Sequence, residues 1–271
     1  AYEIGHVTGV QTCALPIWPS VEPAQTMDGL ALLESALDGL ARLLPQIKGP
    51  THVALDEFQE IREVERGLRI QGLLRARIQE MNASFFFVGS RRRLLEDMFT
   101  DRKKPFYQSA AHVRLGPVED AAVERYAVER FASAGVTLAA SGAAAVARLA
   151  RGNPFYLQRL CSRVFDSGGR APGEAEVLAA WSGVLEENAP LYTASIQGLS
   201  IQQKRLLAAV AKEPAAALLG NAYVARWSLG SVSGVQRARD ALAALDLFDQ
   251  DQGVWRVVDP GLADWLMGLY P

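Results

Sequence analysis

The sequence has little of several features that would mark a specialised class of protein. Its 271 residues include only two cysteines, Cys13 and Cys161, which lie far apart and lack the spacing of a metal site. So few cysteines favour a reducing, cytoplasmic setting over a disulfide framework, with Cys161 as a small buried apolar residue. No apolar run reaches the roughly 18 residues of a membrane-spanning helix, so no membrane partner is expected. The 28 basic and 30 acidic residues nearly cancel, which leaves no overall field that would attract nucleic acid.

A phosphate-binding loop is also missing. Such a loop has the pattern Gly-x-x-x-x-Gly-Lys-Ser/Thr between a strand and a helix, where backbone N–H groups and the lysine hold phosphates. The pattern occurs nowhere in this chain.

Residues 1–17 differ in character from the rest of the chain. Val7–Ile17 resembles the translation of a common sequencing adapter, and Ala1–Ile4 resembles the end of that adapter. We therefore interpret residues 1–17 as non-native and exclude them from the fold; the alternative is a short disordered N-terminal segment. On this interpretation the natural sequence begins near Trp18, inside its gene, and the chain is a truncated fragment.

Residues 18–117 predict an α/β domain. Helical spacing of apolar residues alternates with short β-favouring runs, which favours a parallel sheet. The Ser84–Val88 run is continuously apolar, which suits a strand buried on both faces. The expected helices cover 28–47, 66–81 and 91–99, and the candidate strands are Thr51–Leu55, Ser84–Val88 and His112–Leu115.

The rest of the chain predicts two further domains. Residues 118–196 have helical spacing throughout, and residues 197–271 predict three short helices, a small hairpin and a closing helix. That order is typical of a winged helix-turn-helix. The expected helices of the first part cover 119–134, 139–150, 153–166 and 173–188. In the second part, helices are expected at 201–211, 221–227, 231–245 and 260–269, and strands at 247–249 and 254–258.

Two adjacent acids, Asp56 and Glu57, follow an apolar strand. Ligands bind at the carboxyl ends of strands in parallel sheets. A carboxylate at a strand tip can hold Mg²⁺, usually through water, and the next acid can orient a water for attack on a γ-phosphate. Such a pair has the chemistry of a Walker B motif. The alternative is structural: Asp56 caps a helix, and Glu57 interacts with the helix dipole.

Several segments in order resemble the archaeal-type ATPase family, a STAND-like branch of the AAA+ P-loop NTPases. The resemblance runs from about Trp18 to the end of the chain, and the order and spacing of the segments carry it more than any one motif. The segments are Val53–Gln59 as Walker B, Phe87-Val88-Gly89-Ser90, Lys104-Pro105-Phe106-Tyr107, Arg151-Gly152-Asn153-Pro154-Phe155-Tyr156-Leu157 and Trp255–Pro260.

The resemblance implies roles for individual residues. Asp56 would hold Mg²⁺, Glu57 would activate water, and Ser90 would act as a sensor of the γ-phosphate or the attacking water. Gln59 would help to order the site. Gly152 and Pro154 would approach the base and ribose of bound ATP in the helical lid. Ser90 fits equally well as a helix N-cap, and Gly152 with Pro154 also fits a plain break between two helices.

The resemblance also implies what the missing loop does to the sheet. In this fold class the P-loop strand lies between the Ser84–Val88 strand and the His112–Leu115 strand. We therefore expect Thr51–Asp56 and Ser84–Val88 to pair in parallel, and His112–Leu115 to be displaced or to close the gap imperfectly. The full-length parent would bind ATP and Mg²⁺ and hydrolyse ATP, whereas the chain as given should be inactive.

An alternative function uses the winged helix instead. Ser231–Leu245 would be a recognition helix that binds DNA or a protein partner. Its basic residues Arg237 and Arg239 are offset by Asp240, and residues 199–271 carry seven basic and seven acidic residues. Because a net charge of zero is poor for neutralising phosphates, protein recognition or intramolecular packing is favoured over DNA binding.

Overall fold

The computed structural model describes residues 28–269, so the adapter-like residues 1–17 lie outside the described part. The chain divides into two compact units, one up to Val113 and the other from Arg114 onward. None of the helices within residues 28–269 is long and apolar enough to cross a membrane.

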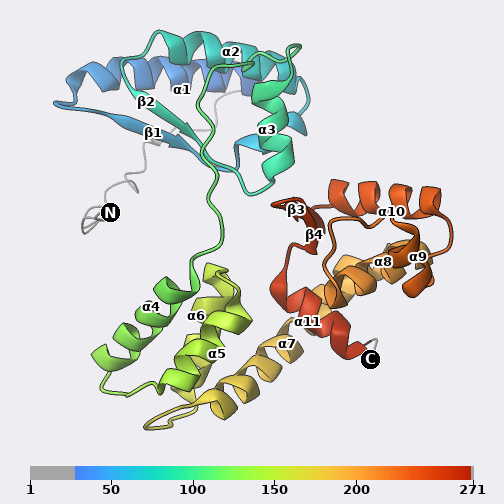
Figure 1. Cartoon of the computed structure of the whole chain (residues 1–271). Coiled ribbons are helices and arrows are strands. Elements are labelled where there is room, and N and C mark those ends of the chain that lie inside the picture. Colours follow the sequence, from blue (N-terminus) through green and yellow to red (C-terminus); the bar gives the residue numbers. More distant parts are fainter. Residues whose placement is uncertain (1–27, 270–271) are drawn as a thin grey trace. The chain divides into compact units, whose positions relative to one another are not determined.

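The first unit contains a two-stranded parallel sheet with helices on one side (Figure 1). His52 is paired with Ser84 and Leu55 with Phe87, which confirms the predicted parallel pairing. The helices are α1 (Gly29–Leu43), α2 (Gly67–Gln79) and α3 (Arg92–Thr100), the 3₁₀ helices are η2 (Leu44–Gln46) and η3 (Phe58–Arg62), and the strands are β1 (His52–Leu55) and β2 (Ser84–Phe87).

Aromatic side chains form the centre of this unit. Phe58, Phe87, Phe99 and Phe106 contact one another with ring centroids 4.6 to 6.2 Å apart. Leucines and isoleucines from α1, α2 and α3 pack around them. The Lys104–Tyr107 segment therefore contributes a core residue, Phe106, which is 2% exposed.

The Ser84–Val88 run has the composition of a strand buried on both faces, but in the described structure only one of its faces is covered. Burial alternates along both strands, and Phe86 is 54% exposed while its neighbour Phe87 packs into the core. The reason is that successive side chains of a strand point to opposite faces, and the described helices cover only one face (Figure 1).

The third candidate strand, His112–Leu115, does not form. These residues have no regular secondary structure, and the side chains of Val113 and Leu115 are 83% and 95% exposed. A strand is stable only where a neighbouring backbone accepts and donates its hydrogen bonds. Among the described residues of the first unit, the sheet consists of β1 and β2 alone.

The second unit begins with four helices and ends in a winged helix. Most predicted boundaries agree with the structure to within a residue or two. The helices are α4 (Asp120–Ser133), α5 (Ala140–Ala150), α6 (Pro154–Asp166), α7 (Glu174–Gln197), α8 (Ile201–Lys212), α9 (Asn221–Arg226), α10 (Val232–Ala244) and α11 (Pro260–Leu269), and the hairpin strands are β3 (Phe248–Asp251) and β4 (Val254–Val257).

Helix α7 is longer than predicted and belongs to both halves of this unit. It continues through Pro190, where a helix would ordinarily kink or break. Its first half packs Trp181 and Val184 into the core of the four helices, and its second half packs Tyr192 and Ile196 into the core of the winged helix. Burial of these two side chains in a second core favours continuing the helix beyond the proline.

Candidate functional site

The first candidate site lies where β1 ends. Asp56 and Glu57 follow the strand directly, and both side chains are exposed. One carboxylate oxygen of Asp56 accepts a hydrogen bond from the Glu57 N–H at 2.9 Å. Glu57 has φ of 47°, in the left-handed region that non-glycine residues rarely adopt. The chain therefore turns sharply at the strand end and leaves both carboxylates accessible.

The parallel pairing brings Ser90 to the same place. The Val88 N–H donates to the Leu55 carbonyl, and the Phe58 N–H donates to the Val88 carbonyl, both at 2.9 Å. These bonds continue the ladder beyond the strands, so the segments after β1 and β2 stay side by side. As a result, the Ser90 hydroxyl donates to Oε2 of Glu57 at 3.0 Å, across 33 residues of sequence.

Gln59 is the second partner of Glu57. Its side-chain amide donates to the same Oε2 and, at 3.4 Å, to the Glu60 carboxylate. These contacts hold the pKa of Glu57 below its usual range; the amide of Gln59 contributes most, followed by the Ser90 hydroxyl, and the nearby Arg91 adds a smaller effect. The Glu57 carboxylate is thus oriented and kept ionised.

Gln59 itself is buried, with 1% of its surface exposed, and its Oε1 has no hydrogen-bond partner in the described structure. This oxygen lies against Gly89, where a Cβ would overlap it. Gly89 therefore makes the space that Gln59 occupies. In the sequence, Gly89 belongs to one of the segments that resemble the ATPase family, but nothing there explains why the residue is a glycine. The reason is its contact with Gln59, which forms only because β1 pairs with β2.

Neither Asp56 nor Ser90 has the helix-capping role that was its structural alternative, whereas Glu57 does lie at the N-terminus of the 3₁₀ helix η3. Asp56 accepts from the next N–H only, and the 3₁₀ helix that follows has no side-chain cap. Ser90 does not cap α3 with its side chain; Arg91 holds the cap position, and the Ser90 hydroxyl is directed to Glu57. The four predicted residues Asp56, Glu57, Gln59 and Ser90 therefore form one cluster.

The donor atoms of this cluster fit Mg²⁺ only in part. Carboxylate oxygens are suitable ligands, and Mg²⁺ is commonly bound by one or two carboxylates together with waters and substrate phosphates. Within residues 28–269, no group of three or more His, Cys, Asp or Glu side chains could hold a metal ion. Asp56 thus suits a Mg²⁺ that arrives with phosphates, and the cluster does not make an all-protein metal site.

Gly152 and Pro154 belong to the second unit, where they lie between α5 and α6. Gly152 has φ of +70°, its carbonyl accepts the Val118 N–H at 2.9 Å, and a Cβ would overlap the Val118 carbonyl. Pro154 is the first residue of α6, and the Asn153 side chain caps that helix. The two residues do end one helix and start the next. Pro154 also lines a groove of about 400 Å³ with Val118, Tyr126 and other side chains of α4 and α6.

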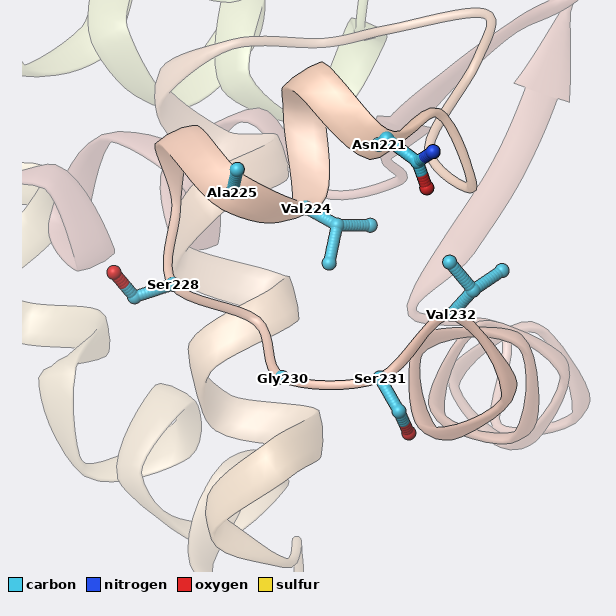
Figure 2. Close-up of a pocket in the computed structure, with 7 residues that line it drawn as sticks. All are labelled: Asn221, Val224, Ala225, Ser228, Gly230, Ser231 and Val232. Carbon is cyan, nitrogen blue, oxygen red and sulfur yellow. The ribbon is translucent and has the colours of Figure 1, made fainter.

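The winged helix carries a second candidate surface. Arg239 of α10 stacks on the Trp255 ring, 5.3 Å from its centroid, and its guanidinium bonds Asp240 at 2.7 Å. A hollow of about 640 Å³ lies between α9 and the start of α10, and Figure 2 shows Val224 and Val232 pointing into it. The hydroxyl of Ser231 beside it caps α10. This surface therefore offers apolar contacts, while one of its two predicted basic residues is already engaged.

Cys161 is a free, partly buried cysteine that packs against the core of the four helices. Burial raises the pKa of its thiol to about 11. Because the thiolate is the reactive form, this environment agrees with the structural role expected from the sequence.

The fold is similar to that of two solved archaeal proteins. A Walker-type ATPase of Pyrococcus abyssi matches with a TM-score of 0.69 and 18% sequence identity, over 89% of this chain and 68% of that chain. The ORC2 protein of Aeropyrum pernix, solved in ADPNP–ADP complexes, matches with a TM-score of 0.53 and 17% identity, over 92% of this chain and 71% of that chain. Residues 190–268 match a family described as "Probable winged helix domain". No curated protein sequence matches the chain. The described part of the chain thus shares the fold of these two structures, with an α/β part and a helical part followed by a C-terminal winged helix.

Proposed function

We propose that this chain is part of an ATPase of the archaeal, STAND-like type, and that it carries the Walker B, sensor and lid segments but not the phosphate-binding loop. The observation that carries the proposal is the exposed Glu57 carboxylate, oriented by Ser90 and Gln59 at the end of a parallel strand. Both donors come from residues that the family resemblance assigns to the same site, and one of them, Ser90, lies 33 residues away in the sequence.

Each residue of the cluster has a separate task in this proposal. Asp56 would hold Mg²⁺ through its carboxylate, and a bound Mg²⁺ would supply neutralisation of charge on the phosphates of ATP. Glu57 accepts a hydrogen bond from the attacking water and so orients it. Ser90 and Gln59 fix the position of Glu57, and Ser90 also senses the γ-phosphate. By the family resemblance, Gly152 and Pro154 would contact the base and ribose of a bound nucleotide. A cytoplasmic setting, expected from the cysteine content, remains part of the proposal.

The phosphate-binding loop would come from residues that this chain does not contain. In this proposal residues 1–17 are the adapter-derived segment. The three domains cover residues 18–117, 118–196 and 197–271. Reading the gene upstream of the codon for Trp18 tests this. We expect the Gly-x-x-x-x-Gly-Lys-Ser/Thr pattern there, after a predicted strand. An upstream sequence without it would overturn the proposal.

Activity gives the direct test. The extended protein should hydrolyse ATP, and residues 18–271 alone should not, because nothing would hold the phosphates. Glu57→Gln in the extended protein should lower turnover at least about 100-fold, which is typical of losing a general base. Glu65→Gln changes an exposed acid outside the cluster and serves as the matched control. Equal turnover in the two variants would exclude the role of Glu57.

The winged helix supports a second candidate function, recognition of a protein partner or of DNA. The apolar hollow beside α10 and the engaged Arg239 favour a protein partner. A gel-shift titration of the whole chain with duplex DNA separates the two. Binding that weakens steeply with salt would indicate phosphate contacts and favour DNA, whereas no shift at low salt would favour protein recognition.

A further inference from the structure

A cluster of polar side chains, some of them buried, joins the winged helix to the lid segment around Gly152. The guanidinium of Arg151, the residue before Gly152, forms an ion pair with Asp264 of α11. It also donates to the Pro260 carbonyl at 3.2 Å. These residues are more than 100 positions apart, and neither the helical periodicity nor any motif indicates the contact.

Asp264 is fully engaged in this cluster. Its second carboxylate oxygen accepts the indole N–H of Trp181 at 3.0 Å, and its side chain is only 11% exposed. A carboxylate this buried is stable only with its partners in place. Arg151 and Trp181 both belong to the helical part of the unit, so α11 is held to that part through two different helices.

A second link lies one helical turn into α6. The Tyr156 hydroxyl, two residues after Pro154, donates to Asp259 at 2.6 Å and lies 2.8 Å from the hydroxyl of Tyr192. Burial and the neighbouring Asp259 raise the pKa of Tyr156, so the hydroxyl keeps its proton and remains the donor. Gly261 of α11 leaves room for both hydroxyls, because a Cβ there would overlap them.

Contacts with the winged helix hold the lid segment at both of its ends. Arg151 has φ of 47°, a conformation that costs free energy for a non-glycine residue and persists only where surrounding contacts hold it. Its guanidinium is held by α11, and the next carbonyl, of Gly152, accepts the Val118 N–H. Asp259 holds Tyr156 directly after the segment.

We propose that Asp264 and Asp259 of the winged helix are positioning residues for the lid segment Arg151–Pro154. This inference rests on the proposed function for its consequence: if the segment faces the nucleotide, the winged helix helps to shape that site. A partner that moves α11 would then change the contact between the lid segment and ATP, and nucleotide binding would in turn change the position of α11.

Amide hydrogen exchange of the whole chain tests the positioning without nucleotide. Asp264→Asn keeps an acceptor for Trp181 but removes the charge that holds Arg151. We expect the amides of Val118 and Asn153, which are bonded within or against the lid segment, to exchange about tenfold faster. Asp251→Asn, an exposed acid in the wing, is the matched control and should leave both amides unchanged.

A purely structural role would give a different result. Loss of Asp264 would then speed exchange in α11 and α8 and leave Val118 unaffected, and that outcome would overturn the proposal. If Asp264→Asn does not fold, Tyr156→Phe removes a single hydroxyl and should still accelerate Asn153; unchanged Asn153 exchange in this variant also refutes it. Because no nucleotide is present, failure of the ATPase assignment would leave this result standing.

Discussion

At the residue scale, the state of Glu57 is set by two neutral neighbours. Both hydrogen bonds favour the ionised carboxylate, and the bond from Gln59 has the larger effect on the pKa. Gln59→Met keeps the length and volume of the side chain but removes the donor. We expect the pKa of Glu57 to rise towards its ordinary value, measured by the ¹³C shift of the carboxyl carbon during an acid titration.

The direction of the pH effect follows from the lowered pKa in the folded state. The stabilising contribution of an ionised Glu57 is fully present above the pKa of the unfolded chain and is lost as pH falls through the lower, folded value. In Gln59→Met this contribution should therefore be smaller, and its loss should be complete at a higher pH than in the parent. Ser90→Ala should show the same trend with a smaller shift. A larger effect of Ser90→Ala would contradict the ranking of the two bonds.

Gly89 should be sensitive to the smallest substitution. In Gly89→Ala the new methyl overlaps the buried Oε1 of Gln59, so we expect a loss of about 1–3 kcal/mol in urea unfolding. Gly72→Ala is the matched control: it lies in α2 with no atom near its added Cβ, and it should stabilise by up to about 1 kcal/mol. The loss should shrink in the double variant Gly89→Ala/Gln59→Ala, because the overlapping side chain is gone.

At the element scale, most helices and strands were predictable because their signals are local. Helical spacing marked α4 to α6, Pro and Gly marked the breaks, and apolar runs marked β1 and β2. The exceptions involve distant partners. Residues 112–115 have the composition of a strand but form none, in agreement with the expectation that this segment would be displaced. Helix α7 continues past its predicted end and past Pro190 because its second half packs into another core.

The same distinction applies to the site. Asp56 and Glu57 could be predicted because they are adjacent acids after an apolar strand. Ser90 was suggested by the order of the family-like segments along the chain. The fit of Gly89 against Gln59, and the contacts of Arg151 with α11, depend on tertiary packing and have no sequence signal.

Helix α11 offers a test of how closely it packs on α6 and α7. Gly261→Ala places a methyl onto the hydroxyls of Tyr156 and Tyr192, and we expect a loss of about 1–3 kcal/mol in unfolding followed by circular dichroism. Gly268→Ala in the same helix meets no neighbouring atom and is the control. Tyr192→Phe should recover part of the loss in the double variant. If both alanine variants unfold alike, the close packing of α11 is wrong.

At the scale of the whole molecule, the parallel sheet of β1 and β2 is the feature that least resembles the sheet of a complete α/β domain. Its open face presents Phe86, which is 54% exposed, and a sheet this small leaves strand edges where another chain can pair. The expected consequence is self-association of residues 18–271 that increases with concentration, measured by sedimentation velocity.

Phe86→Lys distinguishes this face from other apolar surface. The substitution places a charge on the open face without disturbing the covered one, so it should reduce association and change the unfolding free energy by less than about 0.5 kcal/mol. Val128→Lys, at a 41% exposed position on α4, alters apolar exposure in the other unit and should leave association unchanged. If residues 18–271 are monomeric at all concentrations, the open face needs no further strand, and the sheet is complete as it stands. Association that Phe86→Lys abolishes and Val128→Lys does not would instead indicate that this face is built to be covered.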